Sequence, residues 1–111
     1  VVTYSNTSKT DLLEVSEEVF KTHGAVSREA ARAMSAGIRE RAGTGIGLAV
    51  TGIAGPSGGS REKPVGTVFI SLSTSQGDKV TEYHFQGDRQ MIRLQSAQMA
   101  LDRVRRYLLG F

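Results

Sequence analysis

Tyr4 and Lys9 are the residues of this sequence whose types best fit acid–base chemistry at one point. They flank a transition from a predicted strand, residues 1–4, to a predicted short helix that starts at Asn6 or Thr7. A lysine can take a proton from a serine hydroxyl once desolvation or nearby positive charge lowers its pKa, and a neighbouring phenol can orient or relay that proton. An exposed lysine on a short helix and a half-buried tyrosine at a strand end are, however, common features with no catalytic role.

A loop rich in glycine, proline and serine lies between two apolar runs in residues 45–71. Glycine permits positive φ and close backbone approach, so such a loop at a strand end can hold an anion through backbone N–H groups. Thr51 and Gly52 would stand at the strand end, with Gly55 in the loop. The alternative interpretation is a long flexible connection. The loop is neither a P-loop nor a dinucleotide fingerprint, because Gly-Lys-Ser/Thr and GxGxxG are both absent from it.

Arg89 is a second candidate for anion binding, because it directly follows Gly87 and Asp88 at the start of the last predicted helix. A cation on the first turn of a helix opposes the helix dipole, so its position indicates a ligand. The alternative is an ordinary surface charge. Lys63, which precedes Pro64, could simply help to fix the glycine loop, and the sequence leaves its role open.

The two histidines, His23 and His84, are isolated from each other in the sequence. His23 precedes a glycine that should stop a helix, and His84 alternates with Tyr83 and Phe85 on a predicted strand. We therefore interpret both as structural or exposed residues and predict no metal site.

After the strand and the short helix at the start of the chain, three more helices and three more strands are predicted. The helices should follow the capping residues Ser16, Ser27 and Asp88, and should end at Gly24, at Gly43 and near residue 109. Residues 46–50 read as a buried central strand. Residues 65–73 and 80–85 read as antiparallel neighbours joined by a turn at residues 75–78, and the last helix should cover one face of the sheet.

The composition is that of one globular domain. The chain has 111 residues, 39% hydrophobic and 23% charged, and it contains no cysteine. No run approaches the length of a membrane span, and no secretion signal is visible, so we expect a cytoplasmic protein without membrane contact. The net charge of +3 is spread along the chain, and low aromatic content argues against nucleic-acid binding.

The sequence resembles the CinA C-terminal domain family, whose enzymatic members are nicotinamide mononucleotide deamidases. Short motifs carry the resemblance in the family's order: VTYSN, HGAVS, TGIAGPSGG, EKPVGTV and, before the last helix, GDR. The resemblance extends from Val1 to about Leu109. It implies an α/β fold, a mixed sheet with helices on both faces in three layers, part of which an N-terminal segment would contribute.

The resemblance also implies roles for single residues. Tyr4 and Lys9 match the YSN-x-x-K motif that stands beside the family's nucleophilic serine, so they are the expected catalytic residues. The Glu-Ser-Cys-Thr-Gly-Gly run that supplies this serine is absent, and the chain begins inside a predicted strand. Residues 1–111 are therefore expected to form one domain, incomplete at its N-terminus and inactive alone. The expected substrate-binding residues are Asn6, Thr51, Gly52, Gly55 and, for the phosphate, Arg89.

The function implied by the resemblance is hydrolysis of the nicotinamide mononucleotide amide in pyridine nucleotide salvage, through a serine acyl-enzyme. No metal or organic cofactor is expected. The alternative is a non-catalytic nucleotide-binding or interaction domain, because domains of this family also occur fused to another domain associated with competence and DNA damage. Exposed strand edges make a homo-oligomer the expected state.

Overall fold

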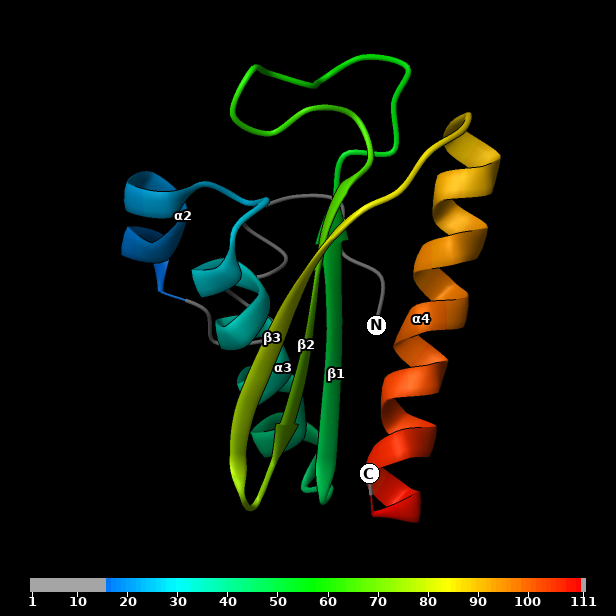
Figure 1. Ribbon diagram of the computed structural model, residues 1–111. Coiled ribbons are helices and arrows are strands. Elements are labelled where there is room, and N and C mark those ends of the chain that lie inside the picture. Colours follow the sequence, from blue (N-terminus) through cyan, green and yellow to red (C-terminus); the bar gives the residue numbers. More distant parts are fainter. Residues whose placement is uncertain (1–15, 111) are drawn as a thin grey trace.

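The fold is α/β: a three-stranded sheet lies between helices on its two faces (Figure 1). The structure, a computed structural model, describes residues 16–110. Helices α2, Glu17–His23, and α3, Arg28–Ala42, lie on one side, and α4, Arg89–Leu109, lies on the other. The described strands are all antiparallel, and the predicted strand and helix before residue 16 lie outside the described part.

The ends of the helices follow the capping residues predicted from the sequence. The Ser16 hydroxyl accepts from the Glu18 amide at the start of α2, and Gly24, with φ +83°, ends that helix. Helix α3 begins after Ser27, whose hydroxyl accepts from the Ala30 amide, and ends at Gly43 in the left-handed region. These boundaries confirm the prediction.

Helix α4 begins at Arg89, because the Asp88 carboxylate caps it by accepting from the Met91 amide at 2.9 Å. It packs against the strands β1, Ile46–Gly52, and β2, Thr67–Thr74, which confirms that the longest helix covers one sheet face. None of the helices within residues 16–110 has the length and apolar character required to cross a membrane.

The strand in the middle of the described sheet is β2, Thr67–Thr74, and all of its residues are buried. Within residues 16–110, β1, Ile46–Gly52, pairs with β2 and with no other strand. The predicted strand at residues 1–4 lies outside the described residues, so a central position for residues 46–50 stays a prediction. The apolar run of β1 indicated burial, but strand order depends on pairing between distant segments. Buried hydroxyls on β2 are compensated by polar partners, as in the 2.7 Å contact between Ser35 and Ser71.

The third strand, β3, Gly77–His84, pairs antiparallel with β2 as predicted. The connection is tighter than expected, because Thr74 pairs with Gly77 and only Ser75 and Gln76 lie between the strands. Gly77 has a φ of +120°, which a residue with a side chain rarely adopts. The turn at this end of the sheet lies opposite the glycine loop (Figure 1).

The core has two halves, one on each face of the sheet. Met34 and Ala49 are the buried residues of the half between α3 and β1. The half beneath α4 contains Val68, Ile70 and Ile92, each at most 2% exposed. Burial on both faces explains why β2 reads as a nearly continuous apolar and hydroxyl-bearing run.

Gly47 sets the distance between α3 and β1. A Cβ atom at Gly47 would lie 2.1 Å from the Ser35 carbonyl oxygen and 2.8 Å from the Arg39 Cβ. We expect Gly47→Ala to lower the free energy of unfolding by about 2–3 kcal/mol, since helix and strand must separate. Gly45→Ala is the matched control, because nothing lies within 4 Å of its added Cβ. Urea unfolding midpoints measure both changes, and equal midpoints would contradict the close packing.

Candidate functional site

The candidate site residues fall into two groups. Tyr4, Asn6 and Lys9 lie outside the described residues, so their roles stay predictions. Thr51, Gly52, Gly55 and Arg89 are placed by the structure around the glycine loop.

The glycine loop, residues 53–66, is held by its own hydrogen bonds. At its base, the Ile53 amide donates to the Thr67 carbonyl at 2.9 Å, and the Gly66 amide donates to the Ile53 carbonyl at 2.7 Å. Within the loop, the Ser60 amide donates to the Lys63 carbonyl at 2.9 Å. These bonds favour a formed loop over a long flexible connection.

Lys63 ties this loop to the end of α2. Its Nζ donates to the His23 carbonyl at 3.2 Å and to the Val26 carbonyl. The His23 carbonyl belongs to the last residue of α2, where a helix leaves carbonyl groups without intrahelical partners and a cation is favourable. Lys63 therefore fixes the loop, the role that the sequence suggested without deciding it.

Arg89 reaches from the first turn of α4 to the glycine loop. Its Nη1 donates to the Gly55 carbonyl at 3.0 Å. This contact gives a structural reason for a cation at an unfavourable helix position. A guanidinium carries five N–H donors, so the bond to Gly55 leaves others for a second acceptor.

Thr51 and Gly52 face opposite sides of the sheet, because neighbouring strand residues alternate. The Thr51 side chain is buried toward α2 and α3, and its hydroxyl donates to the Ala25 carbonyl at 2.8 Å. Gly52 faces α4, and an added Cβ would lie 2.7 Å from a Val68 methyl group. The structure thus brings Gly52, Gly55 and Arg89 to one side, but not the Thr51 hydroxyl.

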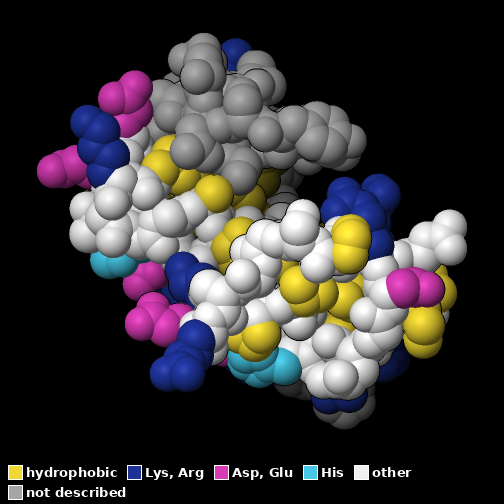
Figure 2. All heavy atoms as spheres, turned by 90° about the horizontal axis from the view of Figure 1, so that it is seen from above, with side chains coloured by type: hydrophobic (Ala, Val, Ile, Leu, Met, Phe, Trp, Pro, Cys, Tyr) yellow, Lys and Arg dark blue, Asp and Glu magenta, His cyan; other side chains and the backbone are white. Residues whose placement is uncertain are grey.

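A groove of about 440 Å³ runs between β1 and α4 next to this loop. Its wall is mainly apolar, and Val50 is 40% exposed there. Seen from the loop end of the molecule, hydrophobic side chains gather on the surface, with basic side chains nearby (Figure 2). The lining residues are Val50, Gly52, Ala54, Val68, Ile92, Arg93, Ser96 and Ala97.

Each histidine lies beside a carboxylate. His23 Nδ1 is 3.6 Å from Glu29 Oε1, and His84 Nε2 is 2.7 Å from Glu82 Oε2. Within residues 16–110, no three side chains of His, Asp or Glu are grouped so that they could hold a metal ion. These contacts agree with structural or exposed histidines.

Comparison with known proteins gives the family. A sequence model described as the CinA C-terminal domain matches residues 1–108. The chain belongs to this family. The match includes Tyr4, Asn6 and Lys9 as well as the glycine loop and Arg89.

Relatives of this CinA-family chain include longer proteins. A CinA-like protein of Syntrophotalea carbinolica is 58% identical over 107 residues, which are 96% of this chain and 26% of the relative. A CinA-like protein of Geotalea uraniireducens is 53% identical over 110 residues, which are 99% of this chain and 26% of the relative. The chain therefore spans about a quarter of the length of these curated relatives.

Solved structures of CinA-family proteins have the same fold. The competence/damage inducible protein CihA of Agrobacterium tumefaciens matches with a TM-score of 0.89 and 42% identity, over 93% of this chain and 64% of that one. The competence damage-inducible protein A of Klebsiella pneumoniae matches with a TM-score of 0.92 and 33% identity, over 99% of this chain and 68% of that one.

Sequence reasoning missed two structural features of the site. It did not foresee that Arg89 and Gly55, 34 positions apart, are joined by a hydrogen bond. It also gave no direction for the Thr51 hydroxyl, which alternation along β1 turns to the Ala25 carbonyl. The extension of β1 through Gly52 was the missing signal, because it fixes which face each residue occupies.

Proposed function

We propose that the complete protein hydrolyses the amide of nicotinamide mononucleotide to nicotinate mononucleotide and ammonia. The observation that carries the proposal is the family match over residues 1–108, which includes the Tyr4-Ser5-Asn6 and Lys9 motif. The nucleophile in this proposal is a serine that lies outside residues 1–111. The reaction needs no metal or organic cofactor, because serine and water supply the two nucleophiles.

In the proposed mechanism, Lys9 accepts the serine proton while the serine oxygen attacks the amide carbonyl carbon. The C–N bond then breaks, the nitrogen takes a proton, and ammonia leaves an acyl-enzyme. Water attacks the ester, which releases nicotinate mononucleotide and restores the serine. Tyr4 orients the reacting groups or relays the proton, as a phenol beside the lysine can.

Substrate binding in the proposal involves the glycine loop and Arg89. Arg89 already donates to Gly55 and has further N–H groups for phosphate oxygens. Gly52 lies on the face of β1 that turns toward α4, the helix that carries this arginine. Thr51 would contribute its backbone, since its hydroxyl is bound to Ala25, and Asn6 would complete the set.

Arg89→Gln should raise KM for the mononucleotide by about ten- to a hundredfold, because a charge-assisted contact to phosphate is lost. The change in kcat should be small if the contact is equally strong in the ground and transition states. Arg61→Gln is the control, because Arg61 is an exposed arginine of the same loop. Steady-state ammonia release by the complete protein measures both, and an unchanged KM for Arg89→Gln would remove Arg89 from the phosphate site.

The alternative function is a nucleotide-binding or interaction domain without activity. The length of the curated relatives favours keeping it, because the matched region is only 26% of each. Ammonia release separates the two functions, because a binding domain would retain the mononucleotide unchanged.

We also propose that the complete protein is a cytoplasmic homo-oligomer. Helix α4 exposes Leu94, Leu101 and Leu108 by 60%, 68% and 68%, and a spacing of seven residues aligns them on one side of a helix. The aligned leucines form an apolar stripe that another subunit could cover.

A further inference from the structure

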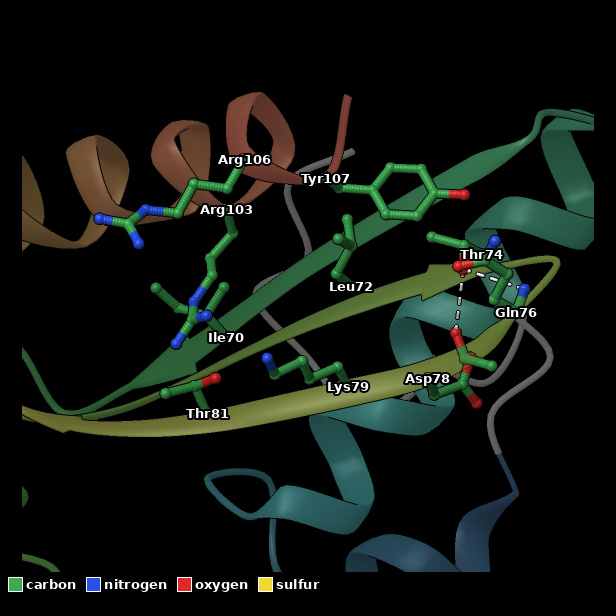
Figure 3. A pocket seen from close by; sticks show the side chains of 11 residues that line it. Ile70, Leu72, Thr74, Gln76, Asp78, Lys79, Thr81, Arg103, Arg106 and Tyr107 are labelled. Atoms are coloured by element: carbon green, nitrogen blue, oxygen red, sulfur yellow. Dashed lines mark hydrogen bonds between the residues drawn. The ribbon is translucent and has the colours of Figure 1, made fainter. Parts of the chain in front are cut away.

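A second pocket lies at the end of the sheet opposite the glycine loop. It occupies about 330 Å³ between the β2–β3 hairpin and the C-terminal half of α4. Figure 3 shows side chains from both strands and from the helix pointing into the same space. The lining residues are Ile70, Leu72, Thr74, Gln76, Gly77, Asp78, Lys79, Thr81, Arg103, Arg106 and Tyr107.

The floor of this hairpin pocket is apolar. Ile70 and Leu72 on β2 are 1% and 8% exposed and face α4. The ring of Tyr107 lies above Leu72, across from the strands (Figure 3). A flat apolar group between ring and floor would bury its surface without displacing a polar contact.

Arg103 is held in place without being neutralised. Its Nε donates to the Tyr83 hydroxyl at 2.8 Å, and its guanidinium lies 5.8 Å from the centroid of that ring. Tyr83 in turn stacks on Phe85 with a centroid distance of 5.3 Å. Neither contact supplies a negative charge, so Arg103 can still donate to an anion from its terminal nitrogens.

Lys79 adds a second cation on the neighbouring strand. Within residues 16–110, neither Lys79 nor Arg103 forms an ion pair with a carboxylate. Asp78 belongs to the pocket rim, but alternation along β3 places its carboxylate on the opposite face from Lys79. The pocket therefore has an apolar floor and two cations that are not paired with any carboxylate of the described residues.

Arg106 differs from these two cations because it forms an ion pair. Its Nε donates to Asp102 Oδ2 at 2.8 Å, and Arg105 binds the other oxygen of the same carboxylate at 2.8 Å. Hydrogen bonds from Arg105 and Arg106 hold the pKa of the Asp102 carboxyl below its usual value. Arg106 thus has a carboxylate partner that it shares with Arg105, whereas Lys79 and Arg103 have none within residues 16–110.

We propose that the hairpin pocket binds a small aromatic anion, a ring that carries a carboxylate or a phosphate. The ring lies between Tyr107 and the Ile70–Leu72 floor, and the acidic group meets Arg103 and Lys79. The volume of about 330 Å³ is within the range of small-ligand sites. The apolar ring of such a ligand matches the apolar floor, and its acidic group matches the two cations. An anion without a ring would contact only the cations.

The test is isothermal titration of the complete protein with benzoate and with phenyl phosphate. Benzamide is the neutral control of the same shape, and acetate and inorganic phosphate are the anions without a ring. We expect at least one aromatic anion to bind at least about tenfold more tightly than benzamide and than the matching ringless anion, because charge-assisted hydrogen bonds and ring burial both contribute. The ratio of the dissociation constants of benzoate and phenyl phosphate shows whether the pocket prefers a carboxylate or a phosphate.

Variants place the binding in the pocket. Lys79→Met should weaken the aromatic anion by about tenfold or more, and Lys21→Met, the same change at an exposed lysine of α2, should leave it within about twofold. Arg103→Gln should weaken binding of the aromatic anion by a similar factor. Because this change also removes the hydrogen bond to Tyr83 and could disturb folding, Lys79→Met tests the pocket independently. The proposal is overturned if neither aromatic anion binds, if benzamide binds as well, or if Arg89→Gln abolishes binding while Lys79→Met does not.

Discussion

Lys9→Ala in the complete protein is expected to reduce ammonia release from nicotinamide mononucleotide by about 10²- to 10⁴-fold, the usual contribution of a general base. Binding of the mononucleotide should be nearly unchanged, because the lysine acts on the serine hydroxyl and the phosphate contacts lie elsewhere. A separation of kcat from binding is therefore the signature of the proposed role. Initial rates of ammonia release and equilibrium titration of the mononucleotide measure the two quantities.

Lys21→Ala is the matched control for this change. Lys21 lies on α2 and is exposed, so its loss removes the same charge without touching the proposed site. The control should retain the activity of the parent protein. If Lys9→Ala keeps more than about a tenth of that activity, a role for Lys9 as general base is rejected.

Residues 1–111 alone should release no ammonia from the mononucleotide, even though Tyr4, Lys9 and Arg89 are all present. The proposed base then has no serine in place to activate. Ser57 is an exposed hydroxyl in the glycine loop, but a substitute nucleophile must approach the carbonyl carbon to about 3–3.5 Å with its base in reach. The comparison is ammonia release by residues 1–111 and by the complete protein at equal concentration.

Turnover by residues 1–111 would show that the serine placed outside them is dispensable. Ser57→Ala would then identify or exclude the loop hydroxyl as the replacement. Circular dichroism of residues 1–111 should accompany the assay, so that a missing rate is attributed to a folded protein.

Local chemistry made the helix ends predictable. Ser16, Ser27 and Asp88 each offer a side-chain oxygen to an amide two or three residues later, and that bond needs no distant partner. Gly24 and Gly43 end their helices for an equally local reason, positive φ. The hairpin between β2 and β3 was predicted on the same basis, although its turn is shorter than expected.

Features that depend on distant segments were not predictable in the same way. The sequence of β1 showed an apolar strand but not that β2 would take the middle position. The bonds from Lys63 to the end of α2 and from Arg89 to Gly55 each join segments more than thirty residues apart. The hairpin pocket has the same origin, because Lys79 and Arg103 line one pocket only when α4 packs against the sheet.

The sheet face occupied by Thr51 shows how one boundary changes a site prediction. The sequence suggested that the strand ends at residue 50 and releases Thr51 into the loop. In the structure β1 continues through Gly52, so Thr51 keeps the alternation and binds the Ala25 carbonyl. The family resemblance indicated Thr51 as a site residue, but the contacts of its side chain depend on the position of Thr51 within β1.

The most direct measurement is the simultaneous quantification of ammonia and nicotinate mononucleotide formed by the complete protein from nicotinamide mononucleotide. Amide hydrolysis predicts equal amounts of both products, at a rate that falls with Lys9→Ala and not with Lys21→Ala. Binding of the mononucleotide with no ammonia above the rate without protein would contradict the account and would favour a nucleotide-binding domain.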